Sequence, residues 1–187
     1  MGKGMFARAA VLLADGFEEI EAITPVDVLR RAGVETLLVG LAGPRAKGSR
    51  GVWCQADVEL AGLEGDFDLL ALPGGMPGAA NIAGSAAARS LAEAQLRSGR
   101  LVAAICAAPA VALAPWGLLK GRRATCYPGM ETGFPPDCQF SPDRVVVDGN
   151  LVTSRGPGTA LEFALRLAGL LAGRETADQL AKDMLAG

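Results

Sequence analysis

The residue best placed for covalent chemistry is Cys106. It stands between an apolar run at 101–105, which predicts a buried strand, and an alanine-rich segment that predicts a helix. Pro109 suits the first turn of that helix, because a missing N–H costs nothing there. Ala104 and Ala108 are small enough for the tight bend of a nucleophile elbow. The pattern therefore predicts a thiol at a sharp turn between a strand and a helix.

The lack of histidine limits how this thiol can be activated. None of the 187 residues is a histidine, which excludes Cys–His and Ser–His–Asp catalysis and histidine-ligated metal sites. A helix N-terminus contributes about 0.3–1 kcal/mol, at most about 2, and this lowers a thiol pKa of about 8.5 by roughly one unit. We therefore expect a second group to help hold Cys106 as a thiolate near neutral pH. The alternative is an inert core cysteine, since free cysteines are usually buried.

A carboxylate in the first predicted helix is the candidate second group. At about 100° per residue, the helix predicted over 18–32 gathers its apolar side chains on one face, and Glu21 projects among them. Burial raises the pKa of a carboxyl group. A neutral Glu21 could donate a hydrogen bond to a thiolate, and the two groups would titrate as a coupled pair. The alternative is an ion pair between Glu21 and an arginine such as Arg30, Arg31 or Arg155.

Two glycine-containing loops provide further candidates. The loop at 73–78 follows a buried strand, and its glycines allow backbone N–H groups to approach a ligand closely. The N–H groups of Gly75 and Ala107 could together form an oxyanion hole. The loop at 154–158 precedes a predicted helix, and Arg155 could hold an anionic group there. Each feature also has a structural alternative, which is a plain turn for the first loop and an ion-pair or interface role for Arg155.

These residues lie in a chain whose apolar runs alternate with helical stretches. Strands are predicted at or near 9–14, 34–41, Val52, Val58, 69–72, 101–105, 145–147 and 151–154. Helices are predicted over 18–32, from a Ser85 cap to Arg97, from a capping box of Thr159 and Glu162 to 172, and over 175–185. The residues 148–150, Asp-Gly-Asn, predict a hairpin between the last two strands.

This alternation predicts an α/β fold with a doubly wound, mostly parallel sheet and helices on both faces. In such sheets, ligands bind beyond the carboxyl ends of the strands. The rule selects the loops that follow Ala14, Leu72 and Ile105. Cys106 lies in the third of these loops and Gly75 in the second.

Composition narrows the class of protein. Half of the residues are apolar, and 18 basic and 20 acidic residues give a net charge of −2, so we expect one domain over 1–187. There is no basic patch for nucleic acid, no run of about 18 apolar residues for a membrane span, and no glycine-rich nucleotide motif. The four cysteines form no C-x-x-C pair, which argues against a zinc or disulfide framework. We expect a cytoplasmic protein with reduced thiols and no cofactor or metal.

Five ordered segments together resemble the ThiJ/PfpI family, and within it the DJ-one branch of protein deglycases. They are 13–21, 25–33, 72–75, 103–109 and 153–159, and the resemblance covers nearly the whole chain. It implies a flavodoxin-like fold and a homodimer formed through the first helix. The implied interface residues are Ile20, Arg30, Arg31 and Arg50.

The resemblance also implies roles at the site. Cys106 would be the nucleophile and oxidation site, Glu21 would hydrogen-bond it, and Gly75 and Ala107 would lend backbone N–H groups. Candidate substrate-binding residues are Gly74, Tyr127, Arg155 and Pro157. Many family members carry a histidine where this chain has Tyr127. That departure, with alanine at position 107, argues against peptide or glutamine hydrolysis.

The activities implied by the resemblance concern reactive aldehydes. They are the cofactor-free hydration of methylglyoxal to lactate, the removal of early methylglyoxal or glyoxal adducts from proteins, and a redox-linked chaperone role. We therefore expect a cysteine-dependent enzyme of the glyoxalase III or protein deglycase type that protects against carbonyl and oxidative stress. The alternatives are a redox-sensing stress chaperone with an oxidisable Cys106 and little turnover, and a small-molecule or nucleotide-binding module.

Overall fold

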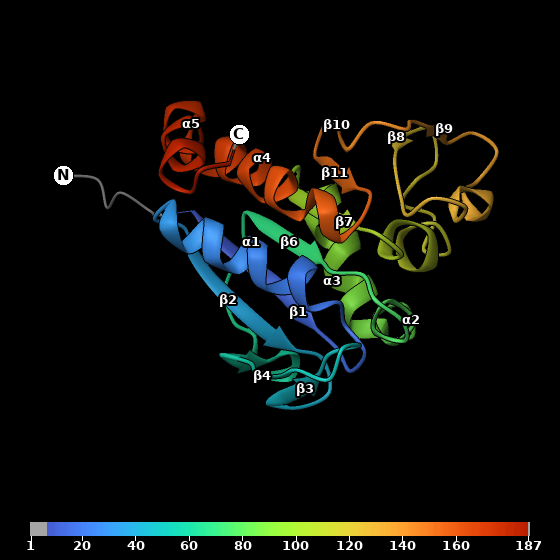
Figure 1. Cartoon of the computed structure of the whole chain (residues 1–187). Helices are drawn as coiled ribbons and strands as arrows, with labels where there is room; N and C mark the ends of the chain where they lie inside the picture. Colours follow the sequence, from blue (N-terminus) through green and yellow to red (C-terminus); the bar gives the residue numbers. More distant parts are fainter. Residues whose placement is uncertain (1–6, 187) are drawn as a thin grey trace.

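A central seven-stranded sheet organises the protein (Figure 1). The computed structural model describes residues 7–186. The strands follow one another across the sheet in the order β10-β11-β7-β6-β1-β2-β5. Their bounds are β1 Arg8–Leu13, β2 Glu35–Gly40, β5 Val58–Glu59, β6 Leu69–Leu72, β7 Leu101–Ile105, β10 Val145–Asp148 and β11 Leu151–Ser154. Neighbouring strands are parallel, except for the antiparallel pair of β10 and β11.

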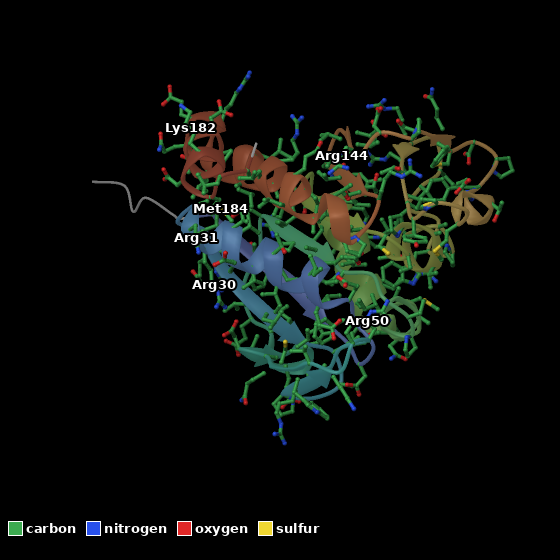
Figure 2. All side chains as sticks on the ribbon, viewed as in Figure 1. Arg30, Arg31, Arg50, Arg144, Lys182 and Met184 are labelled. Atoms are coloured by element: carbon green, nitrogen blue, oxygen red, sulfur yellow. The ribbon has the colours of Figure 1, made fainter. Side chains whose placement is uncertain are left out.

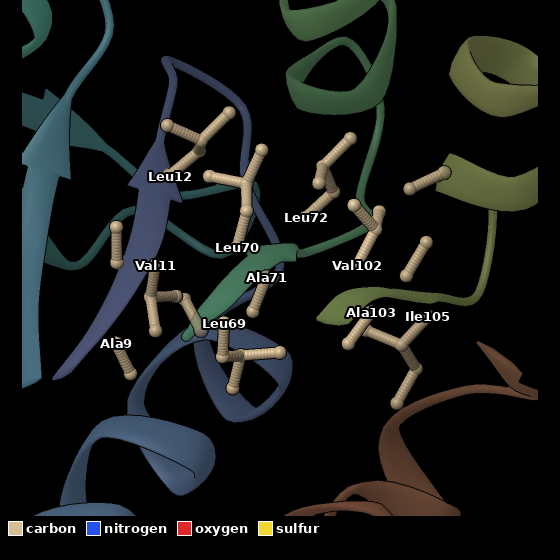
Figure 3. Close-up of a cluster of buried hydrophobic side chains, with 14 of the residues drawn as sticks. Ala9, Val11, Leu12, Leu69, Leu70, Ala71, Leu72, Val102, Ala103 and Ile105 are labelled. Atoms are coloured by element: carbon tan, nitrogen blue, oxygen red, sulfur yellow. The ribbon is translucent and has the colours of Figure 1, made fainter. Parts of the chain in front are cut away.

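The strand order confirms the predicted fold class. Five parallel strands, β2-β1-β6-β7-β11, have the order 2-1-3-4-5 when they are numbered along the chain, which is the flavodoxin-like order. β5 forms one edge of the sheet, and β10, the first strand of the predicted hairpin, forms the other edge. The inner strands are almost continuously apolar because the sheet is covered on both faces. Figure 3 shows their buried side chains, among them Val11, Leu70 and Ile105.

The helices cover both faces of the sheet. Their bounds are α1 Glu19–Arg31, α2 Gly78–Ala83, α3 Ala86–Arg97, α4 Ala160–Ala172 and α5 Arg174–Asp183. Crossovers between parallel strands are right-handed. The step from β1 to β2 and the step from β6 to β7 run in opposite directions across the sheet, so α1 and α3 lie on opposite faces. α4 packs beside α1 (Figure 1).

Several short elements were not predicted. β3 (Arg45–Lys47) lies in a predicted loop and pairs antiparallel with β4 (Trp53–Gln55), which confirms the strand predicted near Val52. β8 (Arg123–Ala124) and β9 (Gln139–Phe140) form a second small sheet. Together with the six-residue α2, these elements are too short to produce a readable hydrophobic period. Among residues 7–186, no helix has the length and apolar character needed to cross a membrane.

Of the two predicted helix caps, one is confirmed and one is wrong. Ser85 caps α3 as predicted, since its hydroxyl accepts a hydrogen bond from the Ala88 N–H at 3.2 Å. The capping box of Thr159 and Glu162 is wrong. The Thr159 hydroxyl accepts a hydrogen bond from the Gly156 N–H instead, at 3.1 Å, and Glu162 pairs with Arg144. The tight turn before α4 turns the Thr159 hydroxyl back toward the loop, away from the helix N–H groups.

Candidate active site

Cys106 occupies a strained turn directly after β7. Its φ angle is +64°, in the left-handed region that residues other than glycine rarely adopt. Two backbone hydrogen bonds hold this conformation. The Cys106 N–H donates to the Ser154 carbonyl at 2.9 Å, and the Tyr127 N–H donates to the Cys106 carbonyl at 2.8 Å. The predicted sharp turn is present, and the side chain lies at the carboxyl edge of the sheet, 8% exposed.

The segment after the turn differs from the regular helix that was predicted. Residues Pro109–Leu113 form a short π-helical segment, in which the Ala114 N–H donates to the Pro109 carbonyl five residues earlier. Pro109 stands at its first position, as predicted. A helix this short carries a weak dipole, because the macrodipole builds up from aligned peptide units.

Glu21 is fully buried beside this turn. Its residue exposure is 0%, and its carboxyl group lies beside the Cys106 side chain, since a Cβ atom on Gly74 would be 2.6 Å from both Glu21 Oε2 and Cys106 Cβ. Glu21 Oε2 accepts a hydrogen bond from the Gly74 N–H at 2.9 Å. Glu21 Oε1 is also buried, and no nitrogen or oxygen donor in the described part of the chain reaches it. A buried carboxylate oxygen that accepts no hydrogen bond costs free energy. If Oε1 instead carries the proton of the carboxylic acid, it can donate that proton to the neighbouring sulfur.

The first turn of α1 fixes the position of Glu21. The Glu18 side chain caps the helix by accepting a hydrogen bond from the Glu21 N–H at 2.9 Å. The Glu18 N–H donates to the Gly74 carbonyl at 3.0 Å, so the helix start is tied to the loop after β6. Glu18 was predicted to favour the helix N-terminus but was not among the predicted site residues. Its place in the first turn was the available signal, because acidic residues favour helix N-termini.

The alternative in which Glu21 pairs with an arginine is wrong. Arg30 donates to the Thr36 carbonyl and pairs with Asp57, and Arg31 pairs with Asp27 at 2.9 Å. The Arg155 guanidinium donates to the Pro142 carbonyl at 3.0 Å. Within residues 7–186, the carboxyl group of Glu21 is thus buried without a cation to balance it.

The two side chains perturb each other's ionisation. Burial, and next the charge of Glu18, raise the pKa of Glu21 to about 7, against the hydrogen bonds from Cys106 and Gly74. Burial, followed by the charge and hydrogen bond of Glu21, raises the pKa of Cys106 to about 12. Hydrogen bonds from the backbone N–H groups of Gly75 and Ala107 act in the opposite direction on the sulfur.

The expectation that peptide dipoles lower the pKa of Cys106 is therefore wrong for the thiol beside an ionised Glu21. Desolvation of the sulfur and repulsion from the carboxylate outweigh two backbone donors. Near neutral pH the pair releases its first proton and then carries a single negative charge. That charge has two arrangements, a carboxylate beside a thiol or a thiolate beside a carboxylic acid.

Gly74 allows the close approach of the two groups. A Cβ atom at this position would lie 2.6 Å from Cys106 Cβ and 2.6 Å from Glu21 Oε2. We expect Gly74→Ala to lower the free energy of unfolding by about 1–3 kcal/mol, because overpacking forces the neighbours apart. Urea denaturation measures the loss. Gly43→Ala is the matched control, since no atom lies within 4 Å of a Cβ there. Equal stabilities of the two variants would contradict the packing.

The raised pKa of Glu21 predicts a pH-dependent stability. The folded protein holds this proton up to about pH 7, whereas the unfolded chain releases it near 4.5. The stabilisation is complete below about pH 4.5 and is lost as the pH rises through 7. Relative to Glu21→Gln, the wild type should lose on the order of a few kcal/mol of unfolding free energy across this interval. Urea denaturation at pH 5 and pH 8 measures the change. If the difference in unfolding free energy between the wild type and Glu21→Gln is the same at both pH values, the prediction is wrong.

The remaining predicted site residues have different surroundings. Tyr127 is bonded to Cys106 through its backbone and is about half exposed. Gly74 and Gly75 flank the Glu21 and Cys106 side chains, as described above. Pro157 is half-buried and begins a 3₁₀ turn, while the contact with Pro142 occupies one nitrogen of Arg155. Sequence reasoning missed Gly156, which lies against Tyr127.

The predicted interface residues lie on the surface. Figure 2 shows Arg30, Arg31 and Arg50, and Ile20 is 52% exposed on α1. Arg30 and Arg31 also form ion pairs within the chain, and the Arg50 N–H donates to Glu19 at 2.7 Å. The structure contains one chain, so the homodimer stays a prediction.

Two surface hollows lie apart from Cys106. The larger, about 860 Å³, runs between α4 and α5. The smaller, about 360 Å³, lies beyond β1 and β2 and is lined by Asp15, Arg45 and Asn81 among others. The candidate site is therefore identified by the geometry of its side chains and not by either of these hollows. Within residues 7–186, no three His, Cys, Asp or Glu side chains are grouped as a metal ion would require.

Comparison with known proteins places this arrangement in a family. Residues 7–169 match the model of the DJ-1/PfpI family. Protein dj-1beta of Drosophila melanogaster is 46% identical over 184 residues, which cover 97% of this chain and 98% of the relative. A Caenorhabditis elegans relative, glutathione-independent glyoxalase DJR-1.2, is 37% identical over 173 residues, 89% of each chain.

A solved structure of a DJ-1 protein has the same fold. Oxidized Toxoplasma gondii DJ-1 is 40% identical with a TM-score of 0.92, over 96% of this chain and 98% of that chain. The chain spans less than half the length of two Arabidopsis thaliana relatives that it also matches. The sequence resemblance is confirmed over nearly the whole chain, and this protein belongs to the DJ-1/PfpI family.

Proposed function

We propose that this protein is a cofactor-free enzyme that converts small α-oxoaldehydes such as methylglyoxal into 2-hydroxy acids. The observation that carries the proposal is the buried Glu21 carboxyl group, which the Gly74 N–H holds beside the elbow cysteine. A carboxyl group with a pKa of about 7 is suited to act as both acid and base near neutral pH. The name of the C. elegans relative, a glutathione-independent glyoxalase, supports the same chemistry.

The first step is addition of Cys106 to the aldehyde. The thiolate sulfur bonds to the aldehyde carbon, and the carbonyl electron pair moves to the oxygen, which takes the proton of Glu21. The product is a hemithioacetal, and Glu21 becomes a carboxylate. The N–H groups of Gly75 and Ala107, which point toward the sulfur, also lie where they can stabilise the developing oxyanion.

The second step is a proton transfer between adjacent carbons. The Glu21 carboxylate removes the hydrogen from the former aldehyde carbon to give an enediolate, and then returns that proton to the neighbouring carbon. The hydroxyl proton of the first carbon passes to the oxygen of the second, so that the first oxygen becomes the thioester carbonyl. The result is a 2-hydroxyacyl thioester of Cys106. Water hydrolyses this thioester and releases the hydroxy acid and the thiol. One carbon is oxidised while its neighbour is reduced, so no external oxidant or cofactor is needed.

Early adducts of α-oxoaldehydes on protein amines and thiols form reversibly. The same site would therefore lower their amount by consuming the aldehyde they release, which is the protein deglycase type of activity. Reduced thiols are required, which fits the cytoplasmic location that we expect. The homodimer is a separate expectation. The test is incubation of purified protein with methylglyoxal, without glutathione and with a metal chelator. We expect one lactate per methylglyoxal consumed, whereas failure of the wild type to produce lactate overturns the proposal.

A second candidate is a redox-sensing stress chaperone with little turnover. The solved T. gondii relative is described as oxidized, and Cys106 is the thiol that backbone N–H groups stabilise as an anion. Under mild peroxide we expect Cys106 to gain oxygen at least about ten times faster than Cys54 or Cys138. The negative charge that Cys106 shares with Glu21 near neutral pH can lie on its sulfur, and the thiolate is the oxidised species. Peptide mass spectrometry measures the three rates. Equal rates at the three cysteines reject the sensor.

A further inference from the structure

Tyr127 stands at the solvent side of the Cys106–Glu21 pair. Its backbone N–H donates to the Cys106 carbonyl at 2.8 Å, which ties the loop after β8 to the elbow. A Cβ atom placed on Gly156 would lie 3.4 Å from the ring atom Cδ2 of Tyr127 and 4.0 Å from Glu21 Oε1. The ring and the carboxyl oxygen thus flank the same point of the backbone. The ring edge rests on Gly156, and the residue as a whole remains 48% exposed.

Met76 is a second large, uncharged and exposed side chain close to the site in the sequence. Met76 follows Gly75, whose N–H points toward the Cys106 sulfur, and it is 55% exposed. Pro157, next to Gly156, is half-buried. The groups that face the sulfur directly are a carboxyl and two backbone N–H groups, all engaged with the reacting atoms. Two large, uncharged and exposed side chains adjoin these groups, Tyr127 through its backbone bond to Cys106 and Met76 as the neighbour of Gly75 in the chain.

The geometry points to Tyr127 as a specificity-determining residue that binds the carbon substituent of the α-oxoaldehyde. Once the aldehyde carbon is bonded to sulfur, its oxygen faces the backbone donors and its hydrogen faces Glu21. The substituent on the second carbon then extends toward solvent, along the Tyr127 ring. Aromatic rings attract one another beyond the area they bury. The site therefore favours aryl-substituted α-oxoaldehydes over methylglyoxal, a substrate class that deepens the proposed function and rests on it.

The experiment compares two substrates on matched variants. Initial rates with phenylglyoxal and methylglyoxal give the ratio of kcat/KM for each protein, measured early because arylglyoxals also modify arginine. We expect Tyr127→Ala to lower this ratio about tenfold, mainly through KM for phenylglyoxal, since a contact far from the reacting atoms binds ground state and transition state alike. Tyr127→Phe keeps the ring and should keep the ratio within about twofold. Phe140→Ala removes an exposed aromatic from the β8–β9 region and serves as control.

The outcomes separate this inference from the proposed function. A wild type that converts neither substrate, or does so no faster than Cys106→Ser, overturns the proposed function. A Cys106-dependent wild type whose substrate ratio is unchanged in Tyr127→Ala overturns this inference alone. A drop in Tyr127→Phe as large as in Tyr127→Ala also overturns it, because the hydroxyl and not the ring would then select the substrate. If the ratio falls equally in Phe140→Ala, the effect comes from a change in the β8–β9 region and not from the Tyr127 ring, and the inference is again overturned.

Discussion

Cys106→Ser should abolish lactate formation from methylglyoxal, with kcat/KM at least about a thousandfold below the wild type. Serine fits the same turn, because it replaces only the sulfur, and the backbone bonds to Ser154 and Tyr127 remain. Its hydroxyl is a far weaker nucleophile than a thiolate at neutral pH. The expected loss thus belongs to the chemical step and leaves the fold in place. Lactate release and the unfolding midpoint measure the two effects separately.

Cys54→Ser is the matched control for this experiment. Cys54 is a half-buried free thiol in β4, away from Glu21. We expect its variant to keep the wild-type rate within about twofold, since nothing places that sulfur at the site. If Cys106→Ser forms lactate as fast as Cys54→Ser, then the elbow cysteine is not the nucleophile and the proposed function is wrong.

Glu21→Gln should lower kcat by about a hundredfold to ten-thousandfold while Cys106 remains reactive toward iodoacetamide at pH 7. The glutamine carbonyl can still accept the Gly74 N–H, and its NH₂ group can donate to the sulfur. The variant also removes the negative charge that raises the pKa of Cys106. It therefore preserves the thiolate but removes the group that moves protons between carbons. Steady-state turnover and peptide-level alkylation measure the two properties independently.

An exposed carboxylate provides the control for the Glu21 variant. Glu93→Gln changes a residue of α3 that pairs with Arg89 at the surface, and exposed ion pairs contribute little. We expect its turnover to match the wild type. A Glu21→Gln protein that retains wild-type turnover would show that this carboxyl group has no acid–base role. A variant that loses turnover and alkylation together would show that Glu21 acts only by holding the thiol in place.

The strands that support the site were predictable from local patterns. β1, β6 and β7 are short apolar runs bounded by turn residues, and a sheet covered on both faces requires that pattern. The burial of Glu21 followed from its angular position among the apolar side chains of α1. The turn at Cys106 followed from the small residues on either side. In each case the information lies within about a dozen neighbouring residues.

The partners of these groups were not predictable in the same way. The bond from the Gly74 N–H to Glu21 joins residues 53 positions apart, and the contact between Tyr127 and Gly156 depends on two loops that meet only in the fold. The ionisation of Cys106 was predicted wrongly for the same reason. A dipole estimate considers one helix, whereas the pKa depends on how completely the surrounding chain excludes water from the sulfur. Distances across the sheet decide these properties.

The central claim is that Cys106 and Glu21 share one negative charge near neutral pH, with the thiolate present because the carboxyl group can hold the proton. The most direct test is the rate of Cys106 alkylation by iodoacetamide between pH 5 and pH 10, followed on the Cys106 peptide by mass spectrometry. The account predicts a rate that rises about tenfold per pH unit at first and reaches a plateau just above pH 7, where the pair has lost its first proton. A rate that climbs through pH 7 without an inflection and keeps rising to pH 10, as for an isolated thiol with a pKa of about 12, would contradict it.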